Sequence, residues 1–142
     1  MIDFGSCGQL MYDLVAELFP ICRSITGAGL RETLRIINEH LPLTFHEIPS
    51  GTVVFDWIVP PEWNIRDAYI LDARKNKVVD FQESNLHVVG YSTPIDKTVT
   101  LAELQKHLHS LENMPDAIPY VTSYYKKQWG FCISHRRREG LK

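Results

Sequence analysis

The sequence predicts an α+β chain, in which two helices come first and a β-rich region follows. Near the N-terminus, apolar residues recur every three or four positions, which is the spacing of one helix face. After Pro42, short runs of β-branched and aromatic residues alternate with turn residues. Because helices and strands are segregated along the chain, we expect an α+β arrangement, or helices from one domain and strands from another.

The first helix is expected from Gly8 to Phe19, and Pro20 ends it because proline lacks the amide that continues a helix. A glycine-bearing loop follows over residues 21–29, and a second helix is expected from Leu30 to His40. Further on, Thr100 and Glu103 have the spacing of a capping box, which predicts a short helix from Thr100 to Leu111. Strands are expected at residues 44–48, 53–59, 67–72, 77–81, 86–91, 120–125 and 130–134.

Composition excludes several classes of protein. The 142 residues are 44% hydrophobic and 23% charged, as in a globular domain, and the net charge of −2 gives no basis for binding nucleic acid or an anionic membrane. No segment has the length and apolarity of a membrane span, and the N-terminus lacks the pattern of a secretory signal. Three widely spaced cysteines, Cys7, Cys22 and Cys132, favour free thiols and a cytoplasmic location.

No complete active-site motif is present in the sequence. None of the six histidines belongs to an H-E-x-x-H pair, and there is no G-x-S-x-G or phosphate-binding loop. His107 and His109 are the closest pair. On a helix their rings would point to different faces, whereas on an extended segment they would share a face that can bind a metal.

Two clusters are candidates for function. The first is the polar loop at residues 23–29, in which Arg23 can grip a carboxylate and Ser24 can bond to a ligand or to the backbone. The second is the aromatic segment at residues 124–131, where Tyr124, Tyr125 and Trp129 offer flat faces with polar edges. An interhelix turn and aromatic packing at a strand turn are the structural alternatives.

Several segments together carry a resemblance to a known family. They lie at residues 19–27, 49–52, 55–57, 62–69, 84–88, 124–125 and 129–132. In this order they resemble aminopeptidase-like proteins of the zinc exopeptidase type, which are often labelled as polysaccharide-biosynthesis proteins with an aminopeptidase-like domain. The resemblance covers essentially the whole chain.

The resemblance implies a domain organisation. Residues 1–45 would be the N-terminal helices of a zinc-peptidase-like α/β domain, 46–120 a small inserted β-rich domain, and 121–142 the return into the peptidase sheet. The zinc ligands of the family lie in segments beyond this chain. The resemblance therefore implies no metal site and no catalytic residue here, and zinc in the full-length protein.

We therefore expect the N-terminal portion of a zinc-dependent aminopeptidase-like hydrolase, inactive alone, whose partner is the remainder of that domain. Its substrate would be peptide-like or derived from an amino acid, contacted by Arg23, Ser24, Tyr124, Tyr125 and Trp129. The alternative is a non-catalytic module that binds a peptide or carbohydrate. Trp57, Trp63 and Tyr69 would be its platforms, although core packing is the commoner role for such residues.

Overall fold

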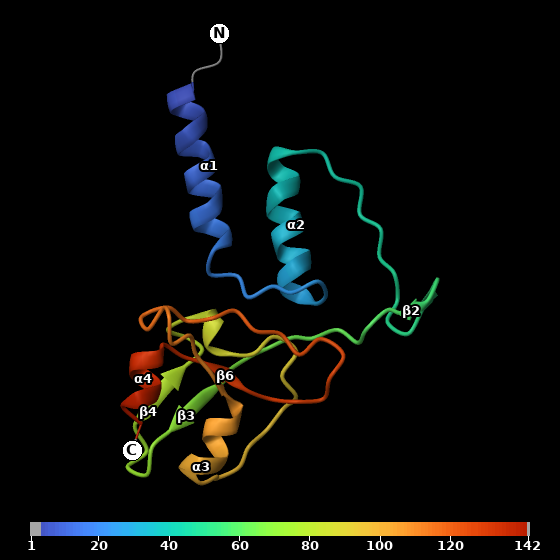
Figure 1. Cartoon of the computed structure of the whole chain (residues 1–142). Coiled ribbons are helices and arrows are strands. Elements are labelled where there is room, and N and C mark those ends of the chain that lie inside the picture. The colour runs from blue at the N-terminus through green and yellow to red at the C-terminus, as the bar shows by residue number, and fades with distance from the viewer. Residues whose placement is uncertain (1–3, 142) are drawn as a thin grey trace. The chain divides into compact units, whose positions relative to one another are not determined.

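The structure is a computed structural model that describes residues 4–141. It divides into two compact units, one ending at Ile65 and the other beginning at Arg66, and each is described by itself. The chain contains both helices and short strands, so the α+β class is confirmed at the level of its secondary-structure content (Figure 1). The expected domains, 1–45, 46–120 and 121–142, concern a longer protein and stay predictions.

Both expected helices of the first unit are present. Helix α1 spans Phe4–Leu18 and α2 spans Ala28–His40, so each begins a few residues earlier than its apolar pattern indicated. Helix α1 ends two residues before Pro20, where the helix can no longer continue. Gly27 precedes α2 with φ +94°, a backbone angle that glycine adopts readily and residues with a β-carbon avoid.

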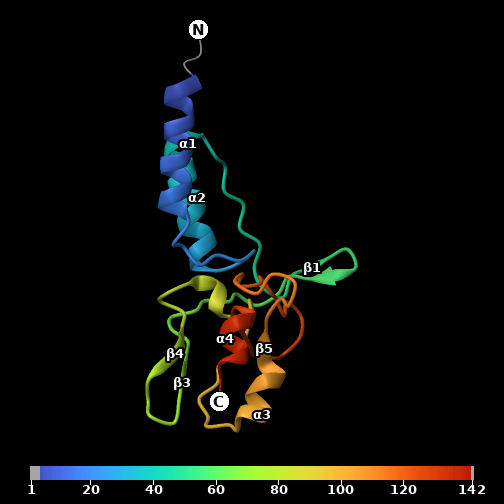
Figure 2. The same cartoon turned by 60° about the vertical axis from the view of Figure 1, so that its left-hand side comes forward.

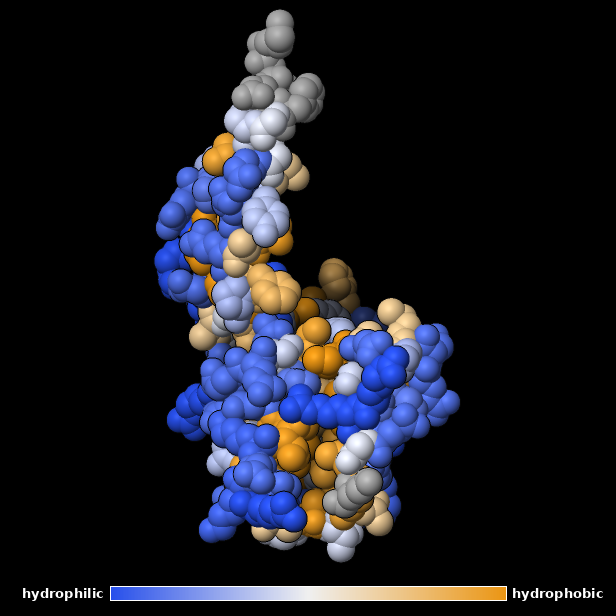
Figure 3. Space-filling view, turned by 90° about the vertical axis from the view of Figure 1, so that its left-hand side faces the viewer, coloured by the Kyte–Doolittle hydropathy of each residue, from blue (hydrophilic) through white to orange (hydrophobic). Residues whose placement is uncertain are grey.

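Helix α1 has almost no packing of its own within the structure. Of its side chains over residues 5–18, only Leu14 and Leu18 are half-buried, and the others are exposed. Figure 3 shows apolar surface among the polar side chains of the N-terminal helices. A helix of this length is marginal in water without tertiary contacts, so α1 needs a surface to cover its apolar side.

The expected strand at 53–59 folds back on itself as a hairpin. Strand β1 spans Val53–Val54 and β2 spans Trp57–Ile58, and the two pair in antiparallel register (Figure 2). The strand predicted at 44–48 is wrong, since this segment has no regular secondary structure and pairs with none of the strands in the described residues. Its alternation was misleading because Phe45 and Ile48 are both exposed.

The second unit opens with the expected hairpin of β3, Tyr69–Leu71, and β4, Lys77–Asp80. Its turn is held by the Asp72 carboxylate, which accepts hydrogen bonds from the amides of Arg74 and Asn76 at 2.8 Å each. A hydrogen bond from the Asn76 side chain holds the pKa of Asp72 below its ordinary value, and the two amide bonds lower it further. The two strand predictions and the turn are confirmed.

Beyond β4 the elements are short. They are the 3₁₀ turn η1 (Asn85–His87), helix α3 (Leu101–Leu104), the 3₁₀ turn η2 (Gln105–His107), strands β5 (Leu108–His109) and β6 (Phe131–Cys132), and helix α4 (His135–Glu139). Strands β5 and β6 pair in parallel. The Thr100 cap is confirmed, because its hydroxyl accepts the Glu103 amide.

Three predictions in this region need correction. The strand expected at 86–91 begins instead as the 3₁₀ turn η1, which the Ser84 side chain caps by accepting the Leu86 amide. The helix expected at 100–111 ends early, because Leu108 is buried in the parallel pair with β6. The predicted strand at 120–125 is reduced to a single bridge between Gly90 and Thr122.

Apart from Pro60, the buried apolar side chains of the described chain all lie in the second unit. They are Val79, Val88, Val89, Leu108, Phe131, Cys132 and Ile133. The histidine of η1, His87, is also buried, and its Nδ1 lies 2.7 Å from the Cys132 carbonyl oxygen. A satisfied polar group of this kind can sit in a core without a net penalty.

Candidate functional site

The polar loop at 23–29 uses its side chains to fix its own backbone. The Arg23 guanidinium donates to the Leu18 carbonyl at 2.6 Å and so satisfies a carbonyl at the end of α1. The Ser24 hydroxyl donates to the Thr26 carbonyl at 3.0 Å and accepts the Thr26 amide at 3.4 Å. Both residues therefore have structural partners, as the structural alternative expected.

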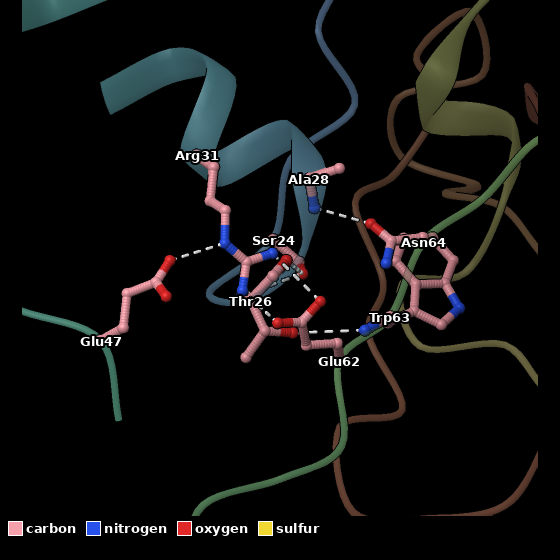
Figure 4. A network of polar contacts seen from close by, with 8 residues as sticks. All are labelled: Ser24, Thr26, Ala28, Arg31, Glu47, Glu62, Trp63 and Asn64. Atoms are coloured by element: carbon pink, nitrogen blue, oxygen red, sulfur yellow. Dashed lines mark hydrogen bonds and ion pairs between the residues drawn. The ribbon is translucent and has the colours of Figure 1, made fainter. Parts of the chain in front are cut away.

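The start of α2 is closed by a segment far along the chain (Figure 4). The Asn64 side-chain oxygen accepts the Ala28 amide at 2.6 Å, which caps a helix end that Gly27 leaves without a side-chain bond. The Trp63 amide donates to the Thr26 hydroxyl at 3.3 Å. A β-carbon on Gly27 would lie 2.5 Å from the Trp63 carbonyl, so only glycine permits this approach.

Arg31 binds two carboxylates in the same region. Its Nε lies 2.8 Å from Glu47, and its two terminal nitrogens both reach the Glu62 carboxylate, the fork geometry that arginine makes with a carboxylate (Figure 4). The hydrogen bond from Arg31 lowers the pKa of Glu62 below its ordinary value. All three side chains are exposed, so the network joins segments of the unit rather than forming a buried charge site.

In the second unit, three tyrosines form an aromatic cluster. The Tyr124 ring makes edge-to-face contacts with Tyr91 at 5.0 Å and with Tyr125 at 4.8 Å between ring centroids. Such contacts are favourable beyond the area they bury. Burial raises the pKa of the Tyr124 hydroxyl, and the neighbouring Tyr91 and Tyr125 add to the rise. Tyr125 is 62% exposed and presents the cluster to solvent.

Backbone pairing at Gly90 brings these rings together. The Gly90 amide donates to Val121, and the Ser123 amide donates back to the Gly90 carbonyl, each at 2.8 Å. Tyr91 and Tyr124 then both adopt positive φ, at 65° and 24°. Residues with side chains seldom hold this conformation, and where it occurs it often accompanies a functional site.

Trp129 is held by its neighbours. Its ring stacks on His107 with 3.7 Å between centroids, and the Lys97 ammonium lies 5.1 Å from its centroid. The His107 Nδ1 also lies 3.1 Å from the Trp129 carbonyl oxygen. A stacking substrate would have to displace the imidazole or the ammonium from this ring.

Residues 4–141 contain no three His, Cys, Asp or Glu side chains placed to hold one metal ion. His107 lies in η2 and His109 in β5, so the pair is neither wholly helical nor wholly extended. Zinc therefore does not fit the donor groups described in this chain, and no step of chemistry through zinc can be assigned to them.

The five predicted contact residues are distributed over both units. Arg23 and Ser24 lie in the first, and Tyr124, Tyr125 and Trp129 in the second. Sequence reasoning missed Tyr91, His107 and Lys97 as neighbours of these aromatic rings. A signal for Tyr91 was present, because Gly90 precedes it and a Ser-Thr-Pro turn follows.

Comparison with known proteins identifies relatives. A family described as "Domain of unknown function (DUF2172)" matches residues 62–142. A curated protein of Clostridium acetobutylicum, named "Putative polysaccharide biosynthesis protein with aminopeptidase-like domain", is 54% identical over 134 residues. That match covers 94% of this chain and 31% of the relative. The resemblance to aminopeptidase-like proteins is thus confirmed.

A solved structure also matches closely. The crystal structure titled "putative peptidase" from Clostridium acetobutylicum superposes with a TM-score of 0.93 at 53% sequence identity. The match covers 96% of this chain and 32% of the solved one. The chain thus spans about a third of the length of the relatives it matches.

Proposed function

This chain belongs to the DUF2172 family, and on that premise we propose that it is the N-terminal part of a longer zinc-dependent aminopeptidase-like hydrolase, inactive by itself. The observation that carries the proposal is its share of the relatives, about a third of a protein named for an aminopeptidase-like domain. In this proposal the remainder of the longer protein supplies the zinc ligands.

Helix α1 supports a role as part of a larger domain. Its exposed apolar side chains are Leu10, Met11, Tyr12 and Val15, each more than 60% exposed. Exposed apolar side chains in such number on one helix are costly in water, and larger apolar patches usually mark an interface. The remainder of the aminopeptidase-like domain is the partner that would cover it.

Zinc, once bound by the remainder, would polarise a carbonyl and lower the pKa of a bound water. The residues of this chain would then bind the substrate and would not bind the metal. We assign peptide-like or amino-acid-derived substrates, with Tyr124 and Tyr125 as contacts through their rings and hydroxyls. Arg23, Ser24 and Trp129 stay proposed contacts, although each would have to exchange a partner it already has.

The test joins this chain to the remaining part of the clostridial relative and compares the product with the 142-residue chain. We expect the joined protein to carry zinc and to release an amino acid from an aminoacyl anilide, and the short chain to do neither. Chelation should abolish the hydrolysis, and added zinc should restore it. A joined protein that folds but binds no zinc would contradict the proposal, as would hydrolysis by the short chain alone.

A second candidate is a non-catalytic peptide- or carbohydrate-binding module. It is favoured by the exposure of Trp57 at 43% and Tyr69 at 47%, two residues for which core packing was the wrong expectation. Titration of the short chain with oligosaccharides and peptides separates the two functions. Saturable binding that Tyr69→Ala weakens would favour the module.

None of the helices within residues 4–141 has the length and apolarity needed to cross a bilayer. Cys7, Cys22 and Cys132 are free thiols. We propose a cytoplasmic location on this ground, since free cysteines are usual in a reducing compartment. We propose neither nucleic acid nor membrane as a partner, because the net charge is −2.

A further inference from the structure

The hairpin of β1 and β2 is a complete but very small ribbon. Val53 pairs with Ile58 and Val54 with Trp57. The ladder is extended by the Gly51 amide, which donates to Val59, and by the Val59 amide, which donates to Thr52, each at 2.9 Å. No third strand joins it among the described residues. A two-stranded ribbon alone is marginally stable in water.

The tip of this hairpin holds an aromatic residue where local folding disfavours one. Phe55 is the first residue of the two-residue turn and has φ 52°, a position that glycine usually occupies in hairpins. A side chain at this angle strains the backbone. Phe55 is also 96% exposed, the highest value among the large hydrophobic residues. Neither the turn nor the packing within this chain explains a phenylalanine here.

The rest of the hairpin surface is apolar on both sides. Val53 and Ile58 are cross-strand partners and share one face, where they are 71% and 56% exposed. Trp57 lies on the opposite face and is 43% exposed. Apolar side chains project from both faces, and Phe55 projects from the tip beside the exposed Asp56. A partner that covers all of them must therefore contact more than one side of the ribbon.

We propose that this hairpin docks into the part of the longer polypeptide that this chain does not span, with Phe55 as the anchor in an apolar pocket. The chain spans about a third of its relatives, so most of the surface available to cover the hairpin belongs to the same polypeptide. A tethered partner is present at a high effective concentration, which favours it over a second molecule. The inference rests on the proposed function in one respect, namely that a remainder exists.

The remainder of the longer polypeptide could also cover a second exposed apolar surface, that of helix α1. Helix α1 exposes Leu10, Met11 and Val15 in the same unit as the hairpin. One large intramolecular partner covers both surfaces, whereas a second copy of this chain would have to meet two separate ones. An aromatic side chain buried in a pocket is the kind of anchor that dominates an interface.

The test compares Phe55→Asn in two settings, the 142-residue chain and the chain joined to the remaining part of the clostridial relative. Asparagine tolerates the left-handed angle, so the substitution relieves the strain at the tip and removes the anchor. We expect the melting temperature of the short chain to rise slightly or stay unchanged, and that of the joined protein to fall by several degrees.

Lys75→Asn is the matched control. Lys75 also has a positive φ, 65°, at an exposed hairpin turn, but its charged side chain is no anchor. This variant should shift both proteins in the same direction. A Phe55→Asn shift of equal sign in both proteins would overturn the proposal.

Light scattering of the short chain tests the alternative that a second copy of the chain covers the hairpin. A concentration-dependent dimer that Phe55→Asn dissociates would assign the hairpin to a second copy and overturn the intramolecular assignment. Zinc content and hydrolysis are separate measurements on the joined protein. If the joined protein is inactive but Phe55→Asn lowers the melting temperature of the joined protein alone, the proposed function is rejected and the docking proposal stands.

Discussion

His109 lies half-buried in strand β5, where its imidazole packs close to Gly130. Burial lowers the pKa of His109, and electrostatic repulsion from Arg138 and from the neighbouring His107 ring lowers it further. Both effects disfavour the protonated ring, because burial removes the water that solvates its charge and the neighbouring groups repel it. The folded chain therefore holds this ring in its neutral form near neutral pH.

A pH dependence of stability follows from this shift. Above an unfolded pKa of about 6.5 the ring is neutral in both states and contributes nothing. Below that pH the unfolded chain takes up the proton first, so the free energy of unfolding decreases as the pH falls toward the folded pKa. Urea unfolding over about pH 5 to 8 should show this loss, and His109→Gln should reduce it.

The control for this measurement is His46→Gln, a substitution at an exposed histidine of the first unit. It should leave the pH dependence as in the parent chain. The carboxyls of Asp72, Asp80, Glu62 and Glu103 have lowered pKa values and lose their stabilising contribution only at lower pH. An unchanged slope in His109→Gln would show that burial of this ring does not govern the effect.

At the scale of elements, the start of α2 depends on a residue 36 positions later in the chain. The sequence predicted the helix and its preceding loop, because both follow from local periodicity and glycine. The cap could not be predicted, because Asn64 lies in an extended segment that only the tertiary fold returns to Ala28. Local hydrogen-bonding residues such as Ser24 and Thr26 were the visible candidates instead.

Asn64→Ala tests this cap. Loss of an N-cap acceptor costs about 0.5–2 kcal/mol of stability, so the urea midpoint should fall. Asn64→Asp keeps an oxygen acceptor and adds a charge that suits a helix N-terminus, so it should retain most of the stability. Asn64 also hydrogen-bonds the Glu62 carboxylate, so Asn64→Asp carries some repulsion between the two carboxylates. An Asn64→Ala variant as stable as the parent chain would show that the cap contributes nothing.

Strands were harder to predict than helices for a physical reason. A helix forms its hydrogen bonds within one segment, whereas a strand needs a partner that sequence patterns do not identify. The segment 44–48 alternates but finds no partner, and 53–59 finds one only by folding back at Phe55. Strand β5 interrupts a helical pattern because Leu108 pairs with Phe131 across the unit.

At the scale of the whole molecule, burial is very uneven. Apart from Pro60, the buried apolar side chains within 4–141 all lie at or beyond Val79, and the first unit otherwise buries only Gly27 and Thr33. Local stability follows buried apolar contact. The two units should therefore differ strongly in their resistance to opening.

Hydrogen exchange measures that difference. In the 142-residue chain, we expect the slowest amides at Val89, Gly90 and Ile133, which are hydrogen-bonded beside the core. Amides of α1 should exchange within the early time points, since its side chains are nearly all exposed. Slow exchange in α1 at low protein concentration would contradict the view that it needs an additional surface.

The sequence predicted the family better than it predicted the site, because several distinctive segments occur in the same order as in that family. The candidate site was predicted less well. Tyr124 and Tyr125 do meet in a cluster. Tyr91 joins them because its neighbour Gly90 pairs with Thr122, which is 32 positions away in the sequence. Arg23 and Ser24 proved to have backbone partners that hold their own loop.

The position of β6 bears on how the second unit is made in the cell. Phe131, Cys132 and Ile133 complete a core whose other members, from Val79 to Leu108, are synthesised first. A growing chain cannot bury those valines until residues 131–133 have left the ribosome, so the unit cannot complete its core before that point in translation. Truncation just before Phe131 would leave a nascent chain with its apolar residues uncovered, a natural substrate for chaperones and proteases.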